Sequence, residues 1–337
     1  MPEAPLTVVA GMVARLVAVG EQLGVERGWM LQEANLDGEA LAERDNRISV
    51  ESNARLWRVL GKRLPDRALA LDWAASWKPT DLGIYGYVFT QSDDLAGSLE
   101  IACRYWRLVD EGALPRLVRS ERSAALSYDI APVFLACQQG PEAVATTVVA
   151  FLRMSLDPTF VPLSVQLPTP RSPRTPALEA FFKTPVQHTV AGPVVVELPL
   201  ELLARKCPGA DPLLAAYLRK TADALLSQVG GATSLTQDVA RRIAARLGTG
   251  EPAPATIAKQ MGLSERTFQR RLAAEGTSFQ AILDEARRSI ALGYLADTRF
   301  AAYEVSFMLG YAEPATFFRA FKRWTGKTPQ EYRATLS

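Results

Sequence analysis

The chain has 337 residues, a formal net charge of +2 and 22% charged residues, values that are ordinary for a globular protein. This length allows two domains, each with its own hydrophobic core. Cys103, Cys137 and Cys207 lie far apart and His188 is the only histidine, so neither a disulfide framework nor a Cys/His zinc site is expected. We therefore expect no metal and no cofactor.

The apolar run at residues 6–20 is the first predicted element. It contains Arg15, has no basic segment before it and is shorter than a membrane-spanning helix. It predicts an amphipathic or buried helix. Because nothing in the sequence indicates export or membrane attachment, the expected location is the cytoplasm.

The N-terminal part of the chain mixes helical and strand patterns, which predicts an α+β domain. Six prolines between residues 158 and 176 exclude a helix there. Helices are predicted within 1–60 and at 95–109, 144–156 and 177–182. The predicted strands are a strand or tight helix-to-strand turn at 81–90, a hairpin of 114–119 with 124–130, an edge strand at 161–167 and a strand at 194–198.

Asp211-Pro212 forms an N-cap and N1 pair that begins a helix ending near Val229. Its apolar stripe makes it a candidate dimerisation helix. The Gly- and Ser-containing segment 230–234 predicts a flexible linker. The expected organisation is a sensor domain at 1–210, a dimerisation helix and linker at 211–235, and an all-α domain at 236–337.

A helix-turn-helix pattern occurs twice in the last quarter of the chain, at 256–272 and 303–321. Each copy has a small residue four positions before a glycine. The small residue lets a second helix pack closely, and the glycine permits the positive φ of the turn. These pairs are Ala258 with Gly262 and Ser306 with Gly310.

Apolar pairs at i and i+4 follow each turn, Phe268 with Leu272 and Phe317 with Phe321. They are expected to anchor the second helix of each motif and to leave its opposite face free. The pattern predicts further helices at 236–247, 253–261 and 279–295, and a last helix that begins at the capping box of Thr328, Pro329 and Glu331.

The helix at 279–295 connects the two motifs. About 17 residues at about 1.5 Å each make it about 25 Å long. With the widths of the helices at both ends, the two recognition helices are expected to enter successive major grooves, about 34 Å apart, on one face of DNA.

In the first motif the candidate DNA contacts are polar. Arg266 and Arg270 can form bidentate hydrogen bonds with guanine, and Gln269 can do so with adenine. Ser264 caps the recognition helix. The complete set is Ser264, Arg266, Thr267, Gln269 and Arg270.

In the second motif the free face is less polar, which predicts readout of thymine methyl groups and DNA shape, with Arg319 as the main polar contact. Lys322, Arg323 and Lys327 are candidates for phosphate contacts. Residues 251–337 hold 12 Lys and Arg against 9 Asp and Glu, a modest basic bias. The candidate contacts of this motif are Ala315, Thr316, Phe318, Arg319 and Lys322.

Three segments, 263–272, 275–279 and 310–329, closely resemble the DNA-binding domain of the AraC/XylS family of bacterial transcription regulators. The resemblance implies two helix-turn-helix subdomains, binding to double-stranded promoter DNA and, usually, activation through RNA polymerase. Residues 20–210 look more loosely like an N-terminal domain described as arabinose-binding-like, through segments 81–87 and 203–212. That resemblance implies sensing of a small-molecule effector and leaves a homodimer as an option.

Aromatic residues gather in the N-terminal domain, where they line a mostly apolar effector pocket or form the core. Arg104 and Arg107 either hold an anionic ligand or lie on a solvated helix face. The candidate effector contacts are Trp73, Tyr85, Tyr87, Phe89, Tyr105 and Trp106, with Trp77 beside them.

Three classes of function were weighed, and the leading hypothesis is a ligand-responsive, sequence-specific transcription regulator, expected to be an activator. An enzyme is not expected, because the sequence has no phosphate-binding glycine loop, no GxSxG motif and no metal ligand set. Adjacent carboxylates such as Asp93 and Asp94 fit a surface without catalysis. The remaining alternative is a DNA-binding regulator that is ligand-independent or controlled by a protein partner.

Overall fold

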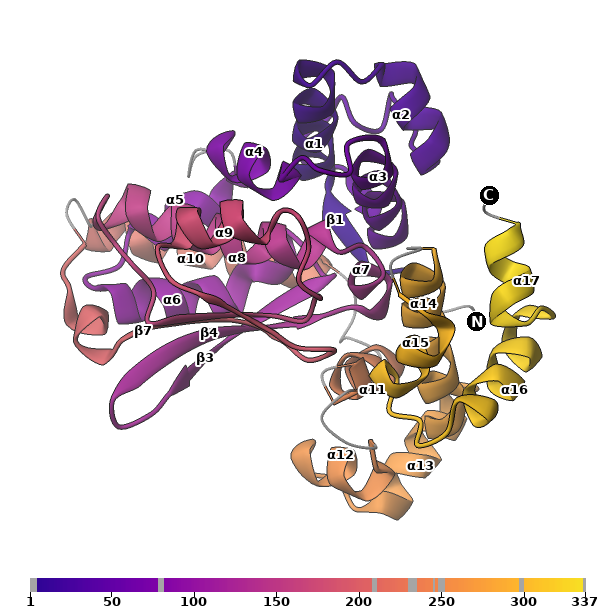
Figure 1. Cartoon of the computed structure of the whole chain (residues 1–337). Coiled ribbons are helices and arrows are strands. Elements are labelled where there is room, and N and C mark those ends of the chain that lie inside the picture. The colour runs from indigo at the N-terminus through magenta and orange to yellow at the C-terminus, as the bar shows by residue number, and fades with distance from the viewer. Residues whose placement is uncertain are drawn as a thin grey trace. The chain divides into compact units, whose positions relative to one another are not determined.

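A computed structural model describes residues 5–77, 82–207, 211–229, 235–244, 246–247, 252–296 and 300–335 (Figure 1). The chain divides into two compact units. Unit 1 comprises residues 1–129, 137–188 and 193–231, and unit 2 comprises 130–136, 189–192 and 232–337. Unit 1 combines helices with sheets and unit 2 is helical, so the predicted fold class is confirmed. The linker predicted at 230–234 lies outside the described residues.

Unit 1 begins with a two-stranded ribbon and helices. The antiparallel strands β1 (Thr7–Val9) and β2 (Arg47–Ser49) pair with Val8 opposite Ile48. The helical prediction for residues 1–60 is confirmed, but the ribbon was missed because three-residue strands are too short to show a period of two. The helices are α1 (Ala10–Gln22), α2 (Arg27–Ala34), α3 (Val50–Arg63) and α4 (Leu69–Ala75).

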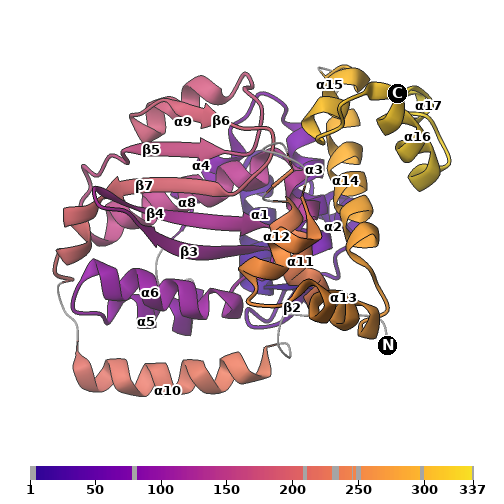
Figure 2. The same ribbon diagram turned by 90° about the horizontal axis from the view of Figure 1, so that it is seen from below.

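A five-stranded sheet forms the centre of unit 1, in the order β3-β4-β7-β5-β6 (Figure 2). The predicted hairpin is confirmed, and the predicted strand at 194–198 is β7. Pairing is antiparallel between β4 and β7 and between β7 and β5, and parallel between β5 and β6. The strands are β3 (Ala113–Arg119), β4 (Ser123–Ile130), β5 (Ser164–Leu167), β6 (Val186–His188) and β7 (Val194–Pro199).

The prediction that 161–167 forms an edge strand was wrong. Strand β5 lies inside the sheet, between β7 and β6. The prolines that suggested an edge, Pro162 and Pro168, flank the paired residues, so every paired residue keeps the N–H that an interior strand needs. The edge strand on this side of the sheet is β6, which has only three residues and gave no sequence signal.

The strand-like prediction at 81–90 was also wrong. The described part of this segment forms helix α5 (Ile84–Thr90), and Asp81 lies outside the described residues. Tyr85, Val88 and Phe89 are buried at the i, i+3, i+4 spacing of a helix, whereas Tyr87 is 49% exposed. A short apolar run does not by itself distinguish a buried strand from a buried helix.

The remaining helices of unit 1 pack around the sheet. Helix α6 contacts β3, α8 contacts β5 and β7, and α10 contacts α5 and α6 (Figure 2). The predicted helices at 95–109, 144–156, 177–182 and 211–229 are confirmed. They are α6 (Leu95–Tyr105) with the 3-10 turn η2 (Trp106–Leu108), α8 (Gln139–Ser155), α9 (Thr175–Phe182) and α10 (Pro212–Gln228). The 3-10 turn η3 (Leu200–Ala204) was not predicted.

Unit 2 is built around one long helix, α14 (Phe279–Leu295), which has the predicted bounds. It contacts α11, α15, α16 and α17. The capping box predicted at Thr328 and Glu331 is confirmed at the start of α17. The other helices are α7 (Pro132–Leu135), α11 (Leu235–Ala244), α12 (Pro254–Gln260), α13 (Glu265–Ala274), α15 (Ala302–Met308), α16 (Pro314–Thr325) and α17 (Pro329–Ala334).

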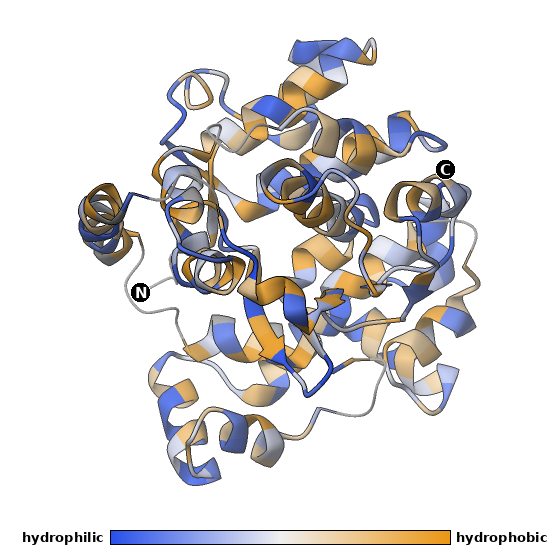
Figure 3. Ribbon diagram, turned by 90° about the vertical axis from the view of Figure 1, so that its left-hand side faces the viewer, coloured by the Kyte–Doolittle hydropathy of each residue, from blue (hydrophilic) through white to orange (hydrophobic). Residues whose placement is uncertain are grey.

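Apolar and polar residues alternate along the helices and strands of both units (Figure 3). This is the pattern of amphipathic elements that bury one face. Within the described part of the chain, no helix is both long enough and apolar enough to cross a membrane.

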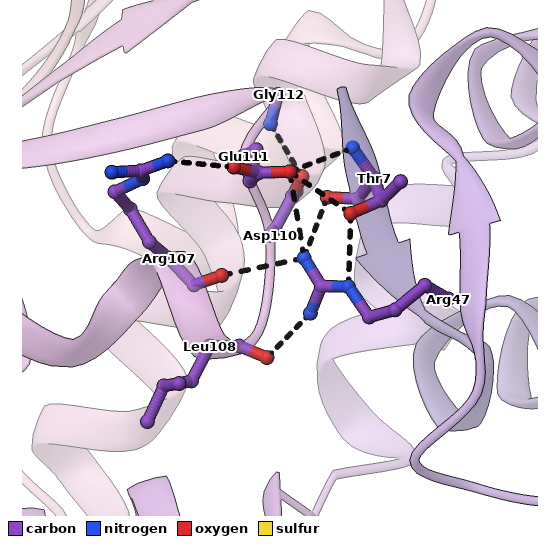
Figure 4. Close-up of polar contacts among 7 residues, drawn as sticks. All are labelled: Thr7, Arg47, Arg107, Leu108, Asp110, Glu111 and Gly112. Atoms are coloured by element: carbon purple, nitrogen blue, oxygen red, sulfur yellow. Dashed lines mark hydrogen bonds and ion pairs between the residues drawn. The ribbon is translucent and has the colours of Figure 1, made fainter. Parts of the chain in front are cut away.

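A buried polar cluster attaches β1 to the segment that precedes β3 (Figure 4). Arg47 donates hydrogen bonds to the carbonyl oxygens of Leu108 (2.7 Å) and Thr7 (3.1 Å). The Glu111 carboxylate accepts hydrogen bonds from Arg107 Nη2 (2.9 Å) and from the Thr7 amide (3.0 Å). The bond between Thr7 and Glu111 joins residues 104 positions apart in the chain, so the cluster attaches the N-terminal strand to a distant part of unit 1.

Asp110 is the most perturbed carboxyl group of this cluster. Burial raises its pKa to about 7, against the opposing effects of a hydrogen bond from the Gly112 amide and of the Arg47 charge. Burial acts the same way on Glu111, but hydrogen bonds from Arg107 and Thr7 outweigh it and lower the pKa of that carboxyl. The pKa values of these two adjacent carboxyl groups are thus shifted in opposite directions.

Replacing Asp110 should change how the free energy of unfolding depends on pH. Its pKa is raised on folding, so its contribution to stability is complete below its unfolded pKa and is lost as pH rises from about 4 to about 7. Asp110→Asn keeps an acceptor for the Gly112 amide and removes the titration. Denaturant unfolding of the variant should show a gain on the order of a few kcal/mol at about pH 8 and little change near pH 4.

Glu111→Gln is the matched control and should be less stable than the wild type at about pH 8, because it removes a charge that Arg107 pairs with. Equal effects of the Asp110→Asn change at both pH values would contradict the assignment of this titration to Asp110.

Candidate nucleic-acid interface

The two helix-turn-helix turns have the same backbone hydrogen bonds. The Leu263 amide donates to the Ala258 carbonyl oxygen (2.9 Å), and the Tyr311 amide donates to that of Ser306 (3.1 Å). The intervening glycines have φ of +67° and +78°, a conformation that side chains disfavour. Both turns are therefore Schellman motifs that end the first helix of each pair.

The apolar residues predicted to anchor the recognition helices are buried. In α13, Phe268 is 0% and Leu272 is 1% exposed, and in α16 both Phe317 and Phe321 are 0% exposed. The small residues before each turn, Ala258 and Ser306, are buried as well. The packing therefore fixes which face of each recognition helix remains free.

The free face of α13 carries Arg266, Gln269 and Arg270, all exposed. Among the described residues neither arginine has an ion-pair partner, while Gln269 Nε2 donates to Glu265 Oε1 at 3.3 Å. Ser264 caps the helix by accepting the Thr267 amide at 3.3 Å. The two arginines thus extend from a fixed helix without an internal carboxylate that competes for them.

The free face of α16 is more apolar, as predicted. Ala315 and Thr316 are exposed, and Phe318 is 37% exposed. Arg319 is also exposed, and its Nη2 lies 3.5 Å from Thr316 Oγ1. Lys322 is exposed one turn further along the helix.

Arg323, the third candidate for a phosphate contact, has an exposed side chain with a partner inside unit 2. Its Nη2 lies 2.8 Å from Asp284 Oδ2 on α14 and forms an ion pair with it. Of the three residues considered for phosphate contacts, Lys322 and Lys327 are exposed with no ion pair among the described residues.

These two surfaces have the chemistry of base recognition. Arginine donates two hydrogen bonds to guanine O6 and N7, and glutamine matches adenine. Apolar and small side chains contact the thymine methyl group. The α13 face therefore suits hydrogen-bonded readout, and the α16 face suits apolar contacts around a single arginine.

The aromatic residues proposed as effector contacts take part in several ring contacts. Trp73 packs between Trp57 (5.6 Å) and Trp77 (4.9 Å), and its Nε1 donates to Thr147 Oγ1. Phe89 packs against Phe151 at 4.6 Å. Both positions belong to the core of unit 1.

Tyr85 and Trp106 do come together, with ring centroids 5.2 Å apart. Tyr128 on β4 completes this group, 6.0 Å from Trp106. All three rings are buried, and Trp106 Nε1 has no hydrogen-bond partner among the described residues. Sequence reasoning missed Tyr128, although it occupies an inward position of the predicted hairpin.

Tyr105 has a different partner. Its hydroxyl donates to Asp223 Oδ1 on α10 at 2.8 Å, and Arg104 Nη2 forms an ion pair with the same oxygen. Arg107 pairs with Glu111. Neither arginine is therefore the free anion contact that the sequence left open.

Within the described part of the chain, no group of three or more His, Cys, Asp or Glu side chains is placed to hold a metal ion. The candidate functional sites are therefore the exposed faces of α13 and α16 and the buried aromatic group of Tyr85, Trp106 and Tyr128.

Two protein-family models match parts of this chain. Residues 24–206 match the arabinose-binding domain of AraC transcription regulators, and residues 257–335 match a helix-turn-helix domain. The first match covers more than half of the chain, and the second covers both helix-turn-helix motifs.

Similar proteins have names that agree with this. The ornithine utilization regulator of Pseudomonas aeruginosa is 28% identical over 98% of this chain and 97% of its own length. The transcriptional regulator VqsM of the same species is 32% identical over 46% of this chain and 48% of its own length. The urease operon transcriptional activator of Escherichia coli is 32% identical over 23% of this chain and 26% of its own length. This chain belongs to the AraC family of transcription regulators and is a DNA-binding protein.

Proposed function

We propose that the protein is a ligand-responsive transcription activator that places α13 and α16 in successive major grooves of promoter DNA. The observation that carries this proposal is the repeated pairing of an anchored helix face with an exposed one, on either side of α14. Helix α14 has 17 residues, which at about 1.5 Å per residue makes it about 25 Å long. Helix widths at both ends bring the separation near the groove repeat of about 34 Å.

Arg270→Ala should weaken binding to the specific operator by about 1–3 kcal/mol with little change on random DNA, because a bidentate contact to one base is lost. Fluorescence anisotropy on both DNAs measures this. Lys322→Ala is the matched control and should weaken binding to both DNAs and flatten the salt dependence, as expected for a phosphate contact. If Arg270→Ala reduces the affinity for both DNAs equally, Arg270 contacts phosphate instead.

A homodimer formed through α10 is part of the proposal. This helix exposes an apolar stripe along most of its length, while only Ala215 and Ala222 are buried among its described side chains. Helices that expose such a stripe commonly bury it against a partner. Leu213 is 84%, Tyr217 69%, Leu214 42% and Leu225 38% exposed.

Tyr217→Glu should convert a dimer to a monomer, because it places a charge in the middle of the stripe. Analytical ultracentrifugation over a concentration series measures the change, and the dissociation constant should rise by at least about tenfold, equivalent to about 1.4 kcal/mol. Ala216→Gln changes an exposed residue beside the stripe and should leave the association unchanged. A wild type that stays monomeric at all concentrations would contradict the dimer.

The arabinose-binding family match and the names of relatives support the effector and the activating role. We place the effector beside Tyr85, Trp106 and Tyr128, whose rings lie next to each other and include the buried Trp106 Nε1, which has no hydrogen-bond partner among the described residues. RNA polymerase is the expected partner of the DNA-bound form.

Native mass spectrometry of the intact protein with a panel of small metabolites, amino acids such as ornithine included, tests the effector. At least one compound should bind and change promoter-dependent transcription by added RNA polymerase, and Trp106→Leu should weaken that binding. Trp73→Phe, in the separate tryptophan group, is the control. If no compound binds and a protein partner changes DNA binding instead, the alternative of a partner-controlled regulator replaces the ligand hypothesis.

A further inference from the structure

We propose that Arg287 is a positioning residue for DNA recognition: it fixes the angle between α14 and the second recognition helix, α16, and thereby the operator spacing that the protein accepts. This inference rests on the two-groove placement proposed above and adds to it the residue that sets the geometry.

Arg287 is buried in α14, with an exposed fraction of 5%. Arginine is rarely buried this fully unless its charge is compensated. Within the described residues it has no carboxylate partner within ion-pair distance. Its neighbours on the buried face of the helix are apolar, Leu283 and Ile290 among them. The buried guanidinium of Arg287 must therefore be stabilised by groups other than carboxylates.

Those partners are the two residues on either side of the turn glycine. Arg287 Nε donates to the Leu309 carbonyl oxygen at 3.2 Å, and the guanidinium lies 4.5 Å from the centre of the Tyr311 ring. Leu309 is the C-cap of α15, so its carbonyl is at the negative end of that helix. A cation over an aromatic face adds a second attraction.

The contact continues from the turn into the recognition helix. The Tyr311 ring lies 5.7 Å from that of Phe317, the buried anchor of α16. One turn before Arg287 on α14, Asp284 forms its ion pair with Arg323 of α16. Helix α14 therefore holds both ends of the turn-to-helix segment, through Arg287 at the turn and Asp284 at α16.

At the place equivalent to Arg287, the first motif has an apolar contact. Helix α11 packs against α12 and α13 as α14 packs against α15 and α16. At the separation that relates the two turn glycines, Val239 takes the place of Arg287, and Leu263 takes the place of Tyr311. Val239 is fully buried. A guanidinium that donates a hydrogen bond and stacks on a ring has a defined direction, which an apolar contact lacks, so only the second motif has a directional contact at this place.

The test compares binding across operators whose two half-sites are separated by spacings that differ in steps of one base pair. The wild type should show a sharp optimum. Arg287→Lys keeps the charge but loses the planar fork, and should reduce affinity at the optimum by about tenfold while broadening the profile. Binding to DNA that carries only the first half-site should change by less than about twofold, which shows that the variant is folded.

Tyr311→Leu introduces the residue found at this place in the first motif and should broaden the profile in the same way. Arg288→Lys, at the neighbouring exposed arginine that pairs with Glu285, should leave the profile unchanged. If the wild type is sharp and both Arg287→Lys and Tyr311→Leu are equally sharp with unchanged affinity, the positioning role is wrong while the two-groove placement stands. If the wild type itself is insensitive to spacing, both are wrong.

Discussion

The burial of one face of each recognition helix is the constraint on which the DNA-binding surface depends. Phe268 with Leu272 in α13, and Phe317 with Phe321 in α16, are withdrawn from solvent almost completely. Because a helix has 3.6 residues per turn, burying these i, i+4 pairs turns the opposite face of each helix toward solvent. Arg266, Gln269 and Arg270 are exposed for that reason, and Arg319 is exposed for the same reason.

The two motifs share a backbone and differ in how they are held. Both turns are closed by the same hydrogen bonds around a glycine with positive φ. In the first motif, the Glu275 carboxylate caps the start of α11 by accepting the Leu235 and Thr236 amides at 2.9 Å each. In the second motif, Arg287 and Asp284 hold the turn and α16 against α14. The two copies of the sequence repeat thus form motifs of similar fold, and different contacts hold each motif to its supporting helix.

The aromatic residues of unit 1 make several different contacts. The aromatic side chains proposed as effector contacts have different ring partners: Trp73 packs on Trp77, Phe89 on Phe151 and Trp106 on Tyr85. Tyr105 contacts α10 through Asp223. The helix proposed to form the dimer is thus bonded directly to α6, which leads into the buried group of Trp106 and Tyr128. Helix α6 therefore connects the buried group of Trp106 and Tyr128 directly to α10.

The sequence alone determined the helices of unit 2 from α11 onward, the Thr328 capping box, the turns and the exposed recognition faces. These follow from signals within a few residues of each other: a glycine after a small residue, an i, i+4 apolar pair, and the Thr328 capping box. The tertiary structure decided what depends on residues distant in the chain. Tertiary packing placed β5 inside the sheet and made α5 a helix. It also buried Asp110 and Arg287, and it brought Arg287 into contact with Leu309 and Tyr311. No local pattern specifies these outcomes, because each is set by which surface another segment covers.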